Sequence, residues 1–203
     1  MGTFADLLWS GGILMIPLFV CSVLSLAIII ERIVALREKQ IVRFDVIRSL
    51  RELLVQKKVP EAIILCEKNP SSIGRIVIEV LRANLKKRTI LKEIAENAGR
   101  QEVPVLEKNL QTLGTIAAIA PLLGLTGTVF GMIKVFTVIS EKGIAHPSQL
   151  AGGISEALVT TATGLVVGIP ALVFFNYFSG RIDKFLLKIE NQVTQLIEVI
   201  IEE

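Results

Sequence analysis

Three long runs of apolar residues dominate the pattern of hydrophobic and polar positions. They cover residues 13–30, 113–133 and 154–178, and Glu156 is the one charged residue inside them. A helix needs about 20 residues to cross the hydrocarbon core of a bilayer. The pattern therefore predicts three transmembrane helices at these positions.

The long segment between the first two spans, residues 31–112, has a different pattern. Leucine, isoleucine and valine recur there at three- and four-residue spacing among charged residues, which is typical of amphipathic helices. We expect Pro60 to open a short helix and Ser71 or Ser72 to cap the next one. The segment is therefore predicted to be a helical domain.

The tail after the third span, residues 179–203, carries an apolar stripe that is five turns long. Its members fall at i, i+3, i+4 and i+7 spacing: Ile182, Phe185, Leu186, Ile189, Val193, Leu196, Ile197 and Ile200. This spacing predicts an amphipathic helix that continues from the third span. Its apolar face can pack against segment 31–112, against a neighbouring copy of the chain, or against both.

The composition agrees with this architecture. Hydrophobic residues make up 52% of the chain and charged residues 20%, and the mean hydropathy is +0.63. Apolar and charged residues must therefore be segregated into blocks. The predicted fold class is an all-α integral membrane protein, with three transmembrane helices extended into a helical cytoplasmic domain.

Several functions lack the residues that they require. No basic stretch is interleaved with aromatic residues, which argues against nucleic-acid binding. No nucleophile–base arrangement, nucleotide loop or metal cluster is present in the sequence, so we expect neither an enzyme nor a bound cofactor or metal. Cys21 and Cys66 have no metal-ligand spacing and are interpreted as packing thiols. His146, in a short polar link, is interpreted as a solvated residue.

The distribution of basic residues predicts the orientation in the membrane. Residues 1–12 hold no Lys or Arg, so the first span is interpreted as a retained helix rather than a signal peptide. Segment 31–112 holds 17 of the 22 Lys and Arg residues, whereas the link 134–153 holds two. Basic loops stay in the cytoplasm. Residues 1–12 and the link are therefore expected outside the cytoplasm, and segment 31–112 and the tail inside it.

Glu156 carries the functional hypothesis. A charged side chain at the centre of a bilayer costs about 2.5–3.5 kcal/mol on insertion scales. If the third helix begins near Ser148, Glu156 lies about 12 Å inside it. Thr160 and Thr163 follow at i+4 and i+7, which places hydroxyls on the same face. Two interpretations stay open: a structural residue near the outer interface, or a proton carrier on a hydrated path.

Small residues form stripes on the second and third spans. On the second span they fall at i, i+3, i+7, i+10 and i+14: Ala117, Ala120, Gly124, Gly127 and Gly131. On the third span, Gly164 and Gly168 form a small-xxx-small pair. Small residues let membrane helices approach closely, so both stripes are predicted packing surfaces. Pro121 and Pro170 lie inside these spans and are expected to kink them.

Three blocks of the chain resemble a known family. They are "MIPLFVCSVLSLAIIIER", which ends in Glu31-Arg32, "APLLGLTGTVFGMI" and "ISEALVTTATGLVVGIPALVFFNYF". They are similar to the three spans of the ExbB/TolQ members of the ExbB/TolQ/MotA group of proton-channel proteins, and the likeness covers nearly the whole chain. MotA proteins usually have four spans, so three spans favour the ExbB and TolQ members.

The resemblance implies a location in the bacterial inner membrane, with residues 1–12 and the link 134–153 in the periplasm, and it implies an assembly and its pore residues. It implies a homopentamer around a dimer of a single-span ExbD/TolR-type partner, together with a TonB/TolA-type protein. By motif, Glu156 matches the family's pore glutamate, and Thr128 and Thr161 match its pore-lining threonines. Thr161 lies about 140° from Glu156 round a regular helix, whereas Thr160 and Thr163 share the face of Glu156. Which threonine faces the pore therefore stays open.

The favoured function is a proton-channel subunit of an inner-membrane motor that drives outer-membrane transport, as the resemblance to ExbB implies. A TolQ-like role in envelope integrity and division is one alternative, and a non-conducting membrane scaffold is another. Sodium also stays open as the coupling ion, because hydroxyls beside a carboxylate can bind either ion. A single acid without a cage of carbonyls favours the proton.

Overall fold

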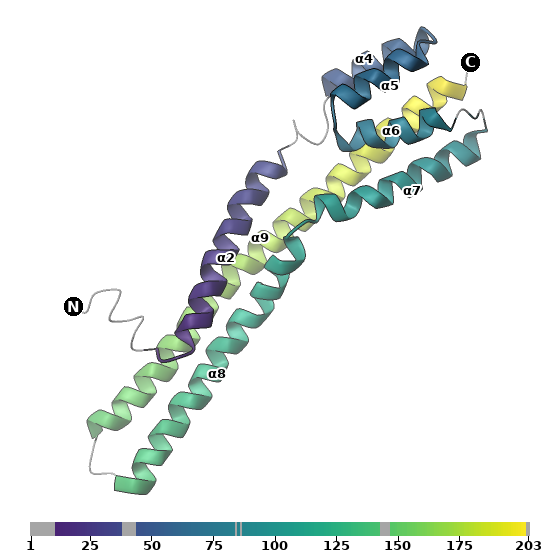
Figure 1. Cartoon of the computed structure of the whole chain (residues 1–203). Coiled ribbons are helices and arrows are strands. Elements are labelled where there is room, and N and C mark those ends of the chain that lie inside the picture. Colours follow the sequence, from purple (N-terminus) through teal and green to yellow (C-terminus); the bar gives the residue numbers. More distant parts are fainter. Residues whose placement is uncertain (1–10, 38–43, 84, 86, 143–146, 202–203) are drawn as a thin grey trace. The chain divides into compact units, whose positions relative to one another are not determined.

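The structure, a computed structural model, describes residues 11–37, 44–83, 85, 87–142 and 147–201 (Figure 1). Every regular element in these ranges is an α-helix: α2 (Met15–Ala35), α4 (Phe44–Val55), α5 (Val59–Lys68), α6 (Ser72–Arg82), α7 (Arg88–Leu106), α8 (Leu110–Lys142) and α9 (Pro147–Ile201). Helices α2, α8 and α9 are long and apolar enough to cross a membrane. The predicted all-α membrane fold is therefore confirmed.

The chain forms two compact units, which we name the membrane unit and the polar unit. Among the described residues, the membrane unit holds 11–31 and 109–177, and the polar unit holds the rest up to residue 201. Helix α9 contributes residues to both units. His146 and residues 1–10, which the sequence predicts to be periplasmic, lie outside the described residues.

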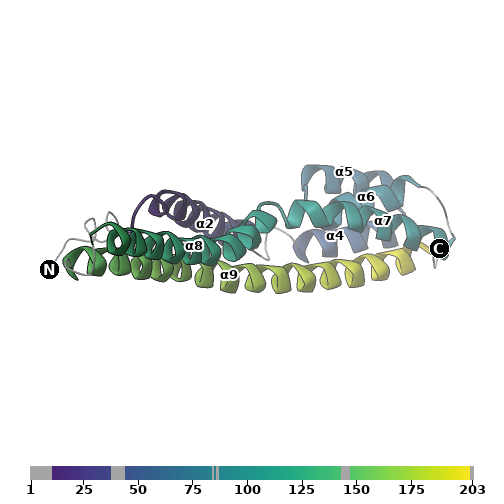
Figure 2. The same cartoon turned by 90° about the horizontal axis from the view of Figure 1, so that it is seen from below.

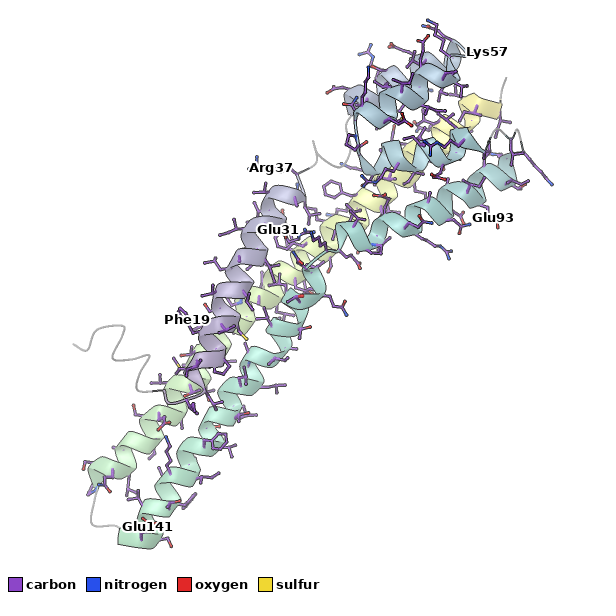
Figure 3. All side chains as sticks on the ribbon, viewed as in Figure 1. Phe19, Glu31, Arg37, Lys57, Glu93 and Glu141 are labelled. Carbon is purple, nitrogen blue, oxygen red and sulfur yellow. The ribbon has the colours of Figure 1, made fainter. Side chains whose placement is uncertain are left out.

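The surface of the membrane unit is apolar. Helices α2, α8 and the first part of α9 run side by side there (Figures 1 and 2). The outward side chains of Ile16, Phe19 and Val166 are 67%, 61% and 70% exposed, and Figure 3 shows Phe19 pointing away from the neighbouring helices. Each Å² of such surface costs about 25 cal/mol in water. A lipid bilayer removes this cost, so the unit is suited to a membrane.

Helices α8 and α9 extend beyond the apolar runs that predicted them. The predicted link 134–153 is mostly helical, because α8 continues to Lys142 and α9 begins at Pro147. Hydropathy marks where a helix leaves the hydrocarbon, whereas the backbone hydrogen bonds continue into the polar residues that follow. The structure therefore places Lys134 two turns inside a helix rather than in a connection.

The polar unit has the buried core of a soluble helical domain. Helices α4 to α7 and the second part of α9 contribute fully buried apolar side chains, among them Leu50, Ile73, Ile76, Leu91 and Ile197. Pro60 lies in the first turn of α5, as predicted. Of the two serines that the sequence offered as a cap, the structure uses Ser71, whose Oγ accepts a hydrogen bond from the Gly74 amide at 3.2 Å.

The amphipathic tail is the second part of α9, and it packs into the polar unit. Six of its eight stripe residues are buried: Ile182, Phe185, Ile189, Val193, Leu196 and Ile197. Four stripe residues line a 310 Å³ cavity together with Ile76 of α6 and Val103 of α7: Leu186, Ile189, Val193 and Ile197. The stripe therefore packs against the chain's own helices, as one of the two interpretations predicted.

An ion pair joins α6 to α7 inside the polar unit. Arg75 donates from Nε to Oε1 of Glu102 at 2.6 Å and from Nη2 to the other carboxylate oxygen. The Glu102 side chain is only 8% exposed, and its hydrogen bond raises the pKa of Arg75. Burial also raises the pKa of the Cys66 thiol, to about 11, with a smaller contribution from Glu67. That thiol stays protonated at neutral pH, in keeping with the packing role expected for it.

Glu31 and Arg32 each make a hydrogen bond within their own unit. In the membrane unit, Glu31 accepts a hydrogen bond from Nδ2 of Asn109 at 3.3 Å. Asn109 adopts a φ of 61°, a left-handed conformation that asparagine tolerates better than most residues. In the polar unit, the buried Arg32 donates from Nη1 to the carbonyl oxygen of Leu106 at 2.9 Å. The motif that the family resemblance singled out is therefore engaged with the chain's own backbone and side chains.

Candidate functional site

The small residues of α8 and α9 form the contact between these two helices. All seven predicted packing residues are buried: Ala117, Ala120, Gly124, Gly127, Gly131, Gly164 and Gly168. A Cβ atom on Gly164 would lie 2.6 Å from the carbonyl oxygen of Ala120 and 2.9 Å from Cα of Gly124. The stripes therefore pack the chain against itself, at a separation that larger side chains would prevent.

Residues that face each other across this contact lie at equal distances along the chain from the link between the two helices. Gly124 meets Gly164, and Gly131 meets Ala157. In each pair, one residue precedes the middle of the link by as many positions as the other follows it. This is the register of an antiparallel helix pair, and it sets which polar residues of α8 can reach α9.

Glu156 lies in the third turn of α9, inside the membrane unit. It follows the first residue of the helix, Pro147, by nine positions, which is roughly 13 Å of helix. Its side chain is 19% exposed. Glu156 is therefore enclosed by its own chain to a large extent, at about the depth that the sequence predicted.

Lys134 of α8 is the charge partner of Glu156. Its Nζ lies 2.6 Å from Oε1 and 2.7 Å from Oε2, so the ammonium donates to both carboxylate oxygens. By sequence alone Lys134 is the first residue of the link 134–153 and has no predicted role in the site. An antiparallel pairing of the second and third spans would have predicted this contact. Lys134 and Glu156 are 22 positions apart in the sequence and lie almost equally far from the link between α8 and α9.

The turn that precedes α2 also contacts the site. The main-chain carbonyl of Gly11 accepts a hydrogen bond from Oγ1 of Thr160 at 2.7 Å. Gly12 packs against the carboxylate of Glu156, so closely that a Cβ atom at Gly12 would overlap the carboxylate. Gly12 also has a φ of 71°, which favours glycine. Gly11 and Gly12, just before α2, therefore cover part of the site at Glu156 and Thr160.

The four predicted pore threonines all hydrogen-bond main-chain carbonyl oxygens. Thr128 donates to Leu125 at 2.6 Å, Thr163 to Val159 at 2.8 Å and Thr161 to Gly124 of α8 at 2.9 Å. Thr160 lies 2.7 Å from the carbonyl of Glu156 as well as from that of Gly11, and it is fully buried.

The environments of these threonines differ more than their hydrogen bonds do. Thr160 is enclosed between the Gly11 turn and Gly127 of α8, whereas Thr128, Thr161 and Thr163 are half-buried. Thr160 and Glu156 share a helix face, as predicted, but that face is filled by the chain's own atoms. Thr128, Thr161 and Thr163 therefore keep more of their surface accessible than Thr160 does.

Charge compensation is the main electrostatic feature of the site. In the described part of α2 no charged residue precedes Glu31, and the next charge along α8 after Lys134 is Glu141, about two turns further on (Figure 3). Lys134 therefore supplies the charge that offsets the cost of placing Glu156 in lipid. A carboxylate is chemically able to bind one proton, and a protonated carboxyl attracts an ammonium less strongly than a carboxylate does.

Metal binding has no support from the residues that the structure describes. Within them, no three His, Cys, Asp or Glu side chains come close enough to hold a metal ion. Glu156 has an ammonium within hydrogen-bond distance of both its oxygens, and a cation in its place would have to displace that group.

Comparisons with known proteins agree on one family. Residues 68–191 match the model of the MotA/TolQ/ExbB proton channel family. A biopolymer transport protein of Synechocystis named ExbB-like 3 is 34% identical over 195 residues, which cover 92% of this chain and 90% of that protein. Biopolymer transport protein ExbB1 of Vibrio cholerae is 29% identical over 184 residues, or 89% and 81% of the two chains.

A TolQ protein is also similar, over a shorter stretch. The Tol-Pal system protein TolQ of Haemophilus influenzae is 38% identical over 86 residues, which cover 42% of this chain and 38% of TolQ. The family model spans more than half of this chain and includes α8, the predicted pore residues and most of α9. The chain therefore belongs to the MotA/TolQ/ExbB proton channel family.

Proposed function

We propose that this chain is the proton-conducting subunit of a bacterial inner-membrane motor, which converts the proton gradient into work on outer-membrane transport. The observation that carries the proposal is the position of Glu156, an acid inside a membrane helix about 13 Å from the helix end. Acids in such positions mark proton or ion pathways. In this proposal Glu156 takes up and releases the proton.

The proposed topology follows the distribution of basic residues. The turn at Gly11 and Gly12 and the link between α8 and α9 lie on the periplasmic side, and the polar unit and the end of α9 lie in the cytoplasm. Glu156 is then close to the periplasmic end of its span, where protons enter. The test is labelling with a membrane-impermeant thiol reagent in intact cells: Ser148→Cys should react, and Arg48→Cys in α4 should not.

The exposure of the threonines supports a choice between them. Thr160 is enclosed by its own chain, whereas Thr161 is half-buried and holds its hydroxyl at the α8–α9 contact. We assign Thr161 and Thr128 to the lining of the proton pathway, and we assign Thr160 a role in helix packing. The hydroxyl of Thr163 donates to the carbonyl of Val159 in the same helix, and Thr163 is a lesser candidate for the pathway.

The proposed assembly is a homopentamer around a single-span dimer of the ExbD/TolR type, which acts on a TonB/TolA-type protein. One carboxylate on one chain does not span a bilayer, so a complete path needs further polar groups from other chains. The exposed apolar faces of α8 and α9, with Leu122, Phe136 and Val166, are available for lipid or for such neighbours. Native mass spectrometry in mild detergent tests the stoichiometry, and a stable monomer would contradict it.

The deciding experiment compares Glu156→Gln with Glu156→Asp and Glu190→Gln in a host that lacks its own copy. Glu190 is an exposed acid of the same helix in the polar unit, which makes it the matched control. We expect Glu156→Gln to abolish energy-dependent uptake while the complex with the single-span partner still forms. Glu156→Asp should retain partial activity and Glu190→Gln full activity. Intact uptake in Glu156→Gln would favour the non-conducting scaffold instead.

A TolQ-like role in envelope integrity and division is the second candidate, because the TolQ match reaches 38% identity over its shorter stretch. The two roles are separated by complementation. Expression in a host without ExbB should restore uptake through outer-membrane receptors, whereas expression in a host without TolQ should restore detergent resistance. If either activity depends on external sodium at constant pH, the coupling ion is sodium rather than the proton.

A further inference from the structure

The ion pair between Lys134 and Glu156 is built from two helices and engages both oxygens of the carboxylate. The Nζ–Oε distances are 2.6 and 2.7 Å, which is within the range of strong charge-assisted hydrogen bonds. The Glu156 side chain is 19% exposed and that of Lys134 is 59% exposed. The acid is therefore held inside the helix contact, whereas the stem of the lysine has free surface in which to move.

The backbone leaves little room for other partners at this carboxylate. Gly12 packs against it, with no space for a side chain, and Thr160 of the next turn is turned towards main-chain carbonyls. In the described parts of α2, α8 and α9 near the site, Lys134 is the group that neutralises Glu156. In this arrangement both carboxylate oxygens of Glu156 accept from the ammonium of Lys134.

Protonation of Glu156 weakens its pairing with Lys134, because the two groups are held together by their opposite charges. The pair of carboxylate and ammonium has no net charge. When a proton binds an oxygen of Glu156, the carboxyl becomes neutral and the pair gains one positive charge, which remains on Lys134. The attraction that held the ammonium is then lost, while its cost of desolvation remains.

The side chain of Lys134 is exposed enough to leave the carboxylate, since 59% of its surface is accessible. Lys134 lies eight residues before the last residue of α8, Lys142, which is roughly 12 Å from the helix end. A long lysine side chain near a membrane boundary extends its ammonium towards water.

We propose that Lys134 is the internal counter-ion of Glu156, which closes the proton site when it is empty and is displaced when a proton arrives. This inference rests on the proposed function and adds a gate to it. Lys134 is a positioning residue: it does not carry the proton, but it decides when Glu156 is available. Without it, the empty carboxylate would stay hydrated and open, and protons would cross without doing work.

The test measures proton leak in membrane vesicles from a host without its own copy, in which the full chain is expressed with its single-span partner. A trapped pH dye reports how fast an imposed pH difference decays. We expect Lys134→Gln to raise the leak about tenfold and to lower coupled uptake. Lys134→Arg keeps the charge and should behave like the wild type. Lys184 is an exposed lysine of α9 in the polar unit. The variant Lys184→Gln is therefore the control for loss of a positive charge.

The double variant Lys134→Gln/Glu156→Gln should show no added leak, because the acid that conducts is gone. A leak in Lys134→Gln equal to that of the wild type, with normal uptake, would overturn the inference. If Lys134→Gln does not assemble with the single-span partner, the assembly of the double variant tests the inference instead. Restored assembly supports the pair, since both charges are then removed, and continued failure to assemble overturns it.

The outcomes separate this inference from the proposed function. Uptake that survives Glu156→Gln would remove the proton role of Glu156 whatever Lys134 does. Loss of uptake in Glu156→Gln, combined with wild-type behaviour of Lys134→Gln, would keep the proton role and remove only the gate.

Discussion

Gly124 of α8 and Gly164 of α9 touch through their backbones, since a Cβ atom on Gly164 would lie 2.9 Å from Cα of Gly124. The same Cβ would lie 2.6 Å from the carbonyl oxygen of Ala120. Backbone atoms cannot rotate away as a flexible side chain can, so the helices themselves would have to separate. This contact sets the distance between the two helices that carry Lys134 and Glu156.

Gly164→Ala should therefore destabilise the protein by about 1–3 kcal/mol, the usual cost of overpacking. Gly152→Ala is the matched control in the same helix, because a Cβ there meets nothing within 4 Å. Alanine is the better helix former, so this control should be neutral or slightly stabilising. Thermal unfolding in detergent measures both, and equal stability of the two variants would contradict the close contact.

Gly12→Ala should disturb the site without changing any charged residue. An added Cβ would overlap the carboxylate of Glu156, and a φ of 71° costs about 1–2 kcal/mol for residues other than glycine. We expect the carboxylate to be pushed away from Lys134 and the proton leak to rise, as in Lys134→Gln. The vesicle leak measures this, and a variant that is stable and does not leak would show that Gly12 has no part in the site.

Two Arg–Glu pairs of the polar unit provide a comparison of buried with exposed ion pairs. Arg75–Glu102 is buried at the carboxylate, whereas Arg82–Glu67 has both side chains more than half exposed. Glu102→Gln should cost about 1–3 kcal/mol, less than a fully buried pair because Arg75 retains access to water. Glu67→Gln should cost less than about 1 kcal/mol. Chemical unfolding of the full chain measures both, and similar losses would contradict the role of burial.

Cys66 should make the polar unit sensitive to alkaline pH. Burial raises the pKa of its thiol from 9.0 to about 11. Between these values the unfolded chain loses the thiol proton while the folded chain keeps it, so unfolding is favoured as the pH rises. Below pH 9 both states keep the proton and no stability is lost, whereas by pH 11 the free energy of unfolding has fallen by about 2–3 kcal/mol.

The measurement is thermal stability of the wild type and of Cys66→Ala between pH 8 and 11. The alanine variant is expected to start less stable, because it leaves a small cavity. Its stability should then fall less with pH, since the thiol is absent. Parallel curves for the two proteins would show that the thiol does not titrate in this way.

The residues of the chain determined its secondary structure and its environment. Inside lipid no water is present to hydrogen-bond the backbone, and a helix pairs its backbone polar groups within one segment. Runs of about 20 apolar residues therefore predicted α2, α8 and the first part of α9. The i, i+3, i+4 spacing from Ile182 to Ile200 predicted the second part of α9. Both properties are local, because each depends on residues within a few turns of one another.

The sequence also predicted the packing surface of small residues, but it did not predict which helix packs against that surface. The stripe from Ala117 to Gly131 indicated a close helix contact, and small residues permit such a contact with any neighbour. Only the antiparallel arrangement of α8 and α9 decided that the stripe meets Gly164 and Gly168 of the same chain.

Tertiary structure alone decided what surrounds Glu156. Its charge and depth follow from the sequence, whereas its contacts with Lys134 and Gly12 join residues 22 and 144 positions away. It also decided that Thr160 is enclosed while Thr161 is not, although the helical period placed Thr160 on the face of Glu156. A helical period states which residues share a face, and only the neighbouring helix determines whether that face is filled or open.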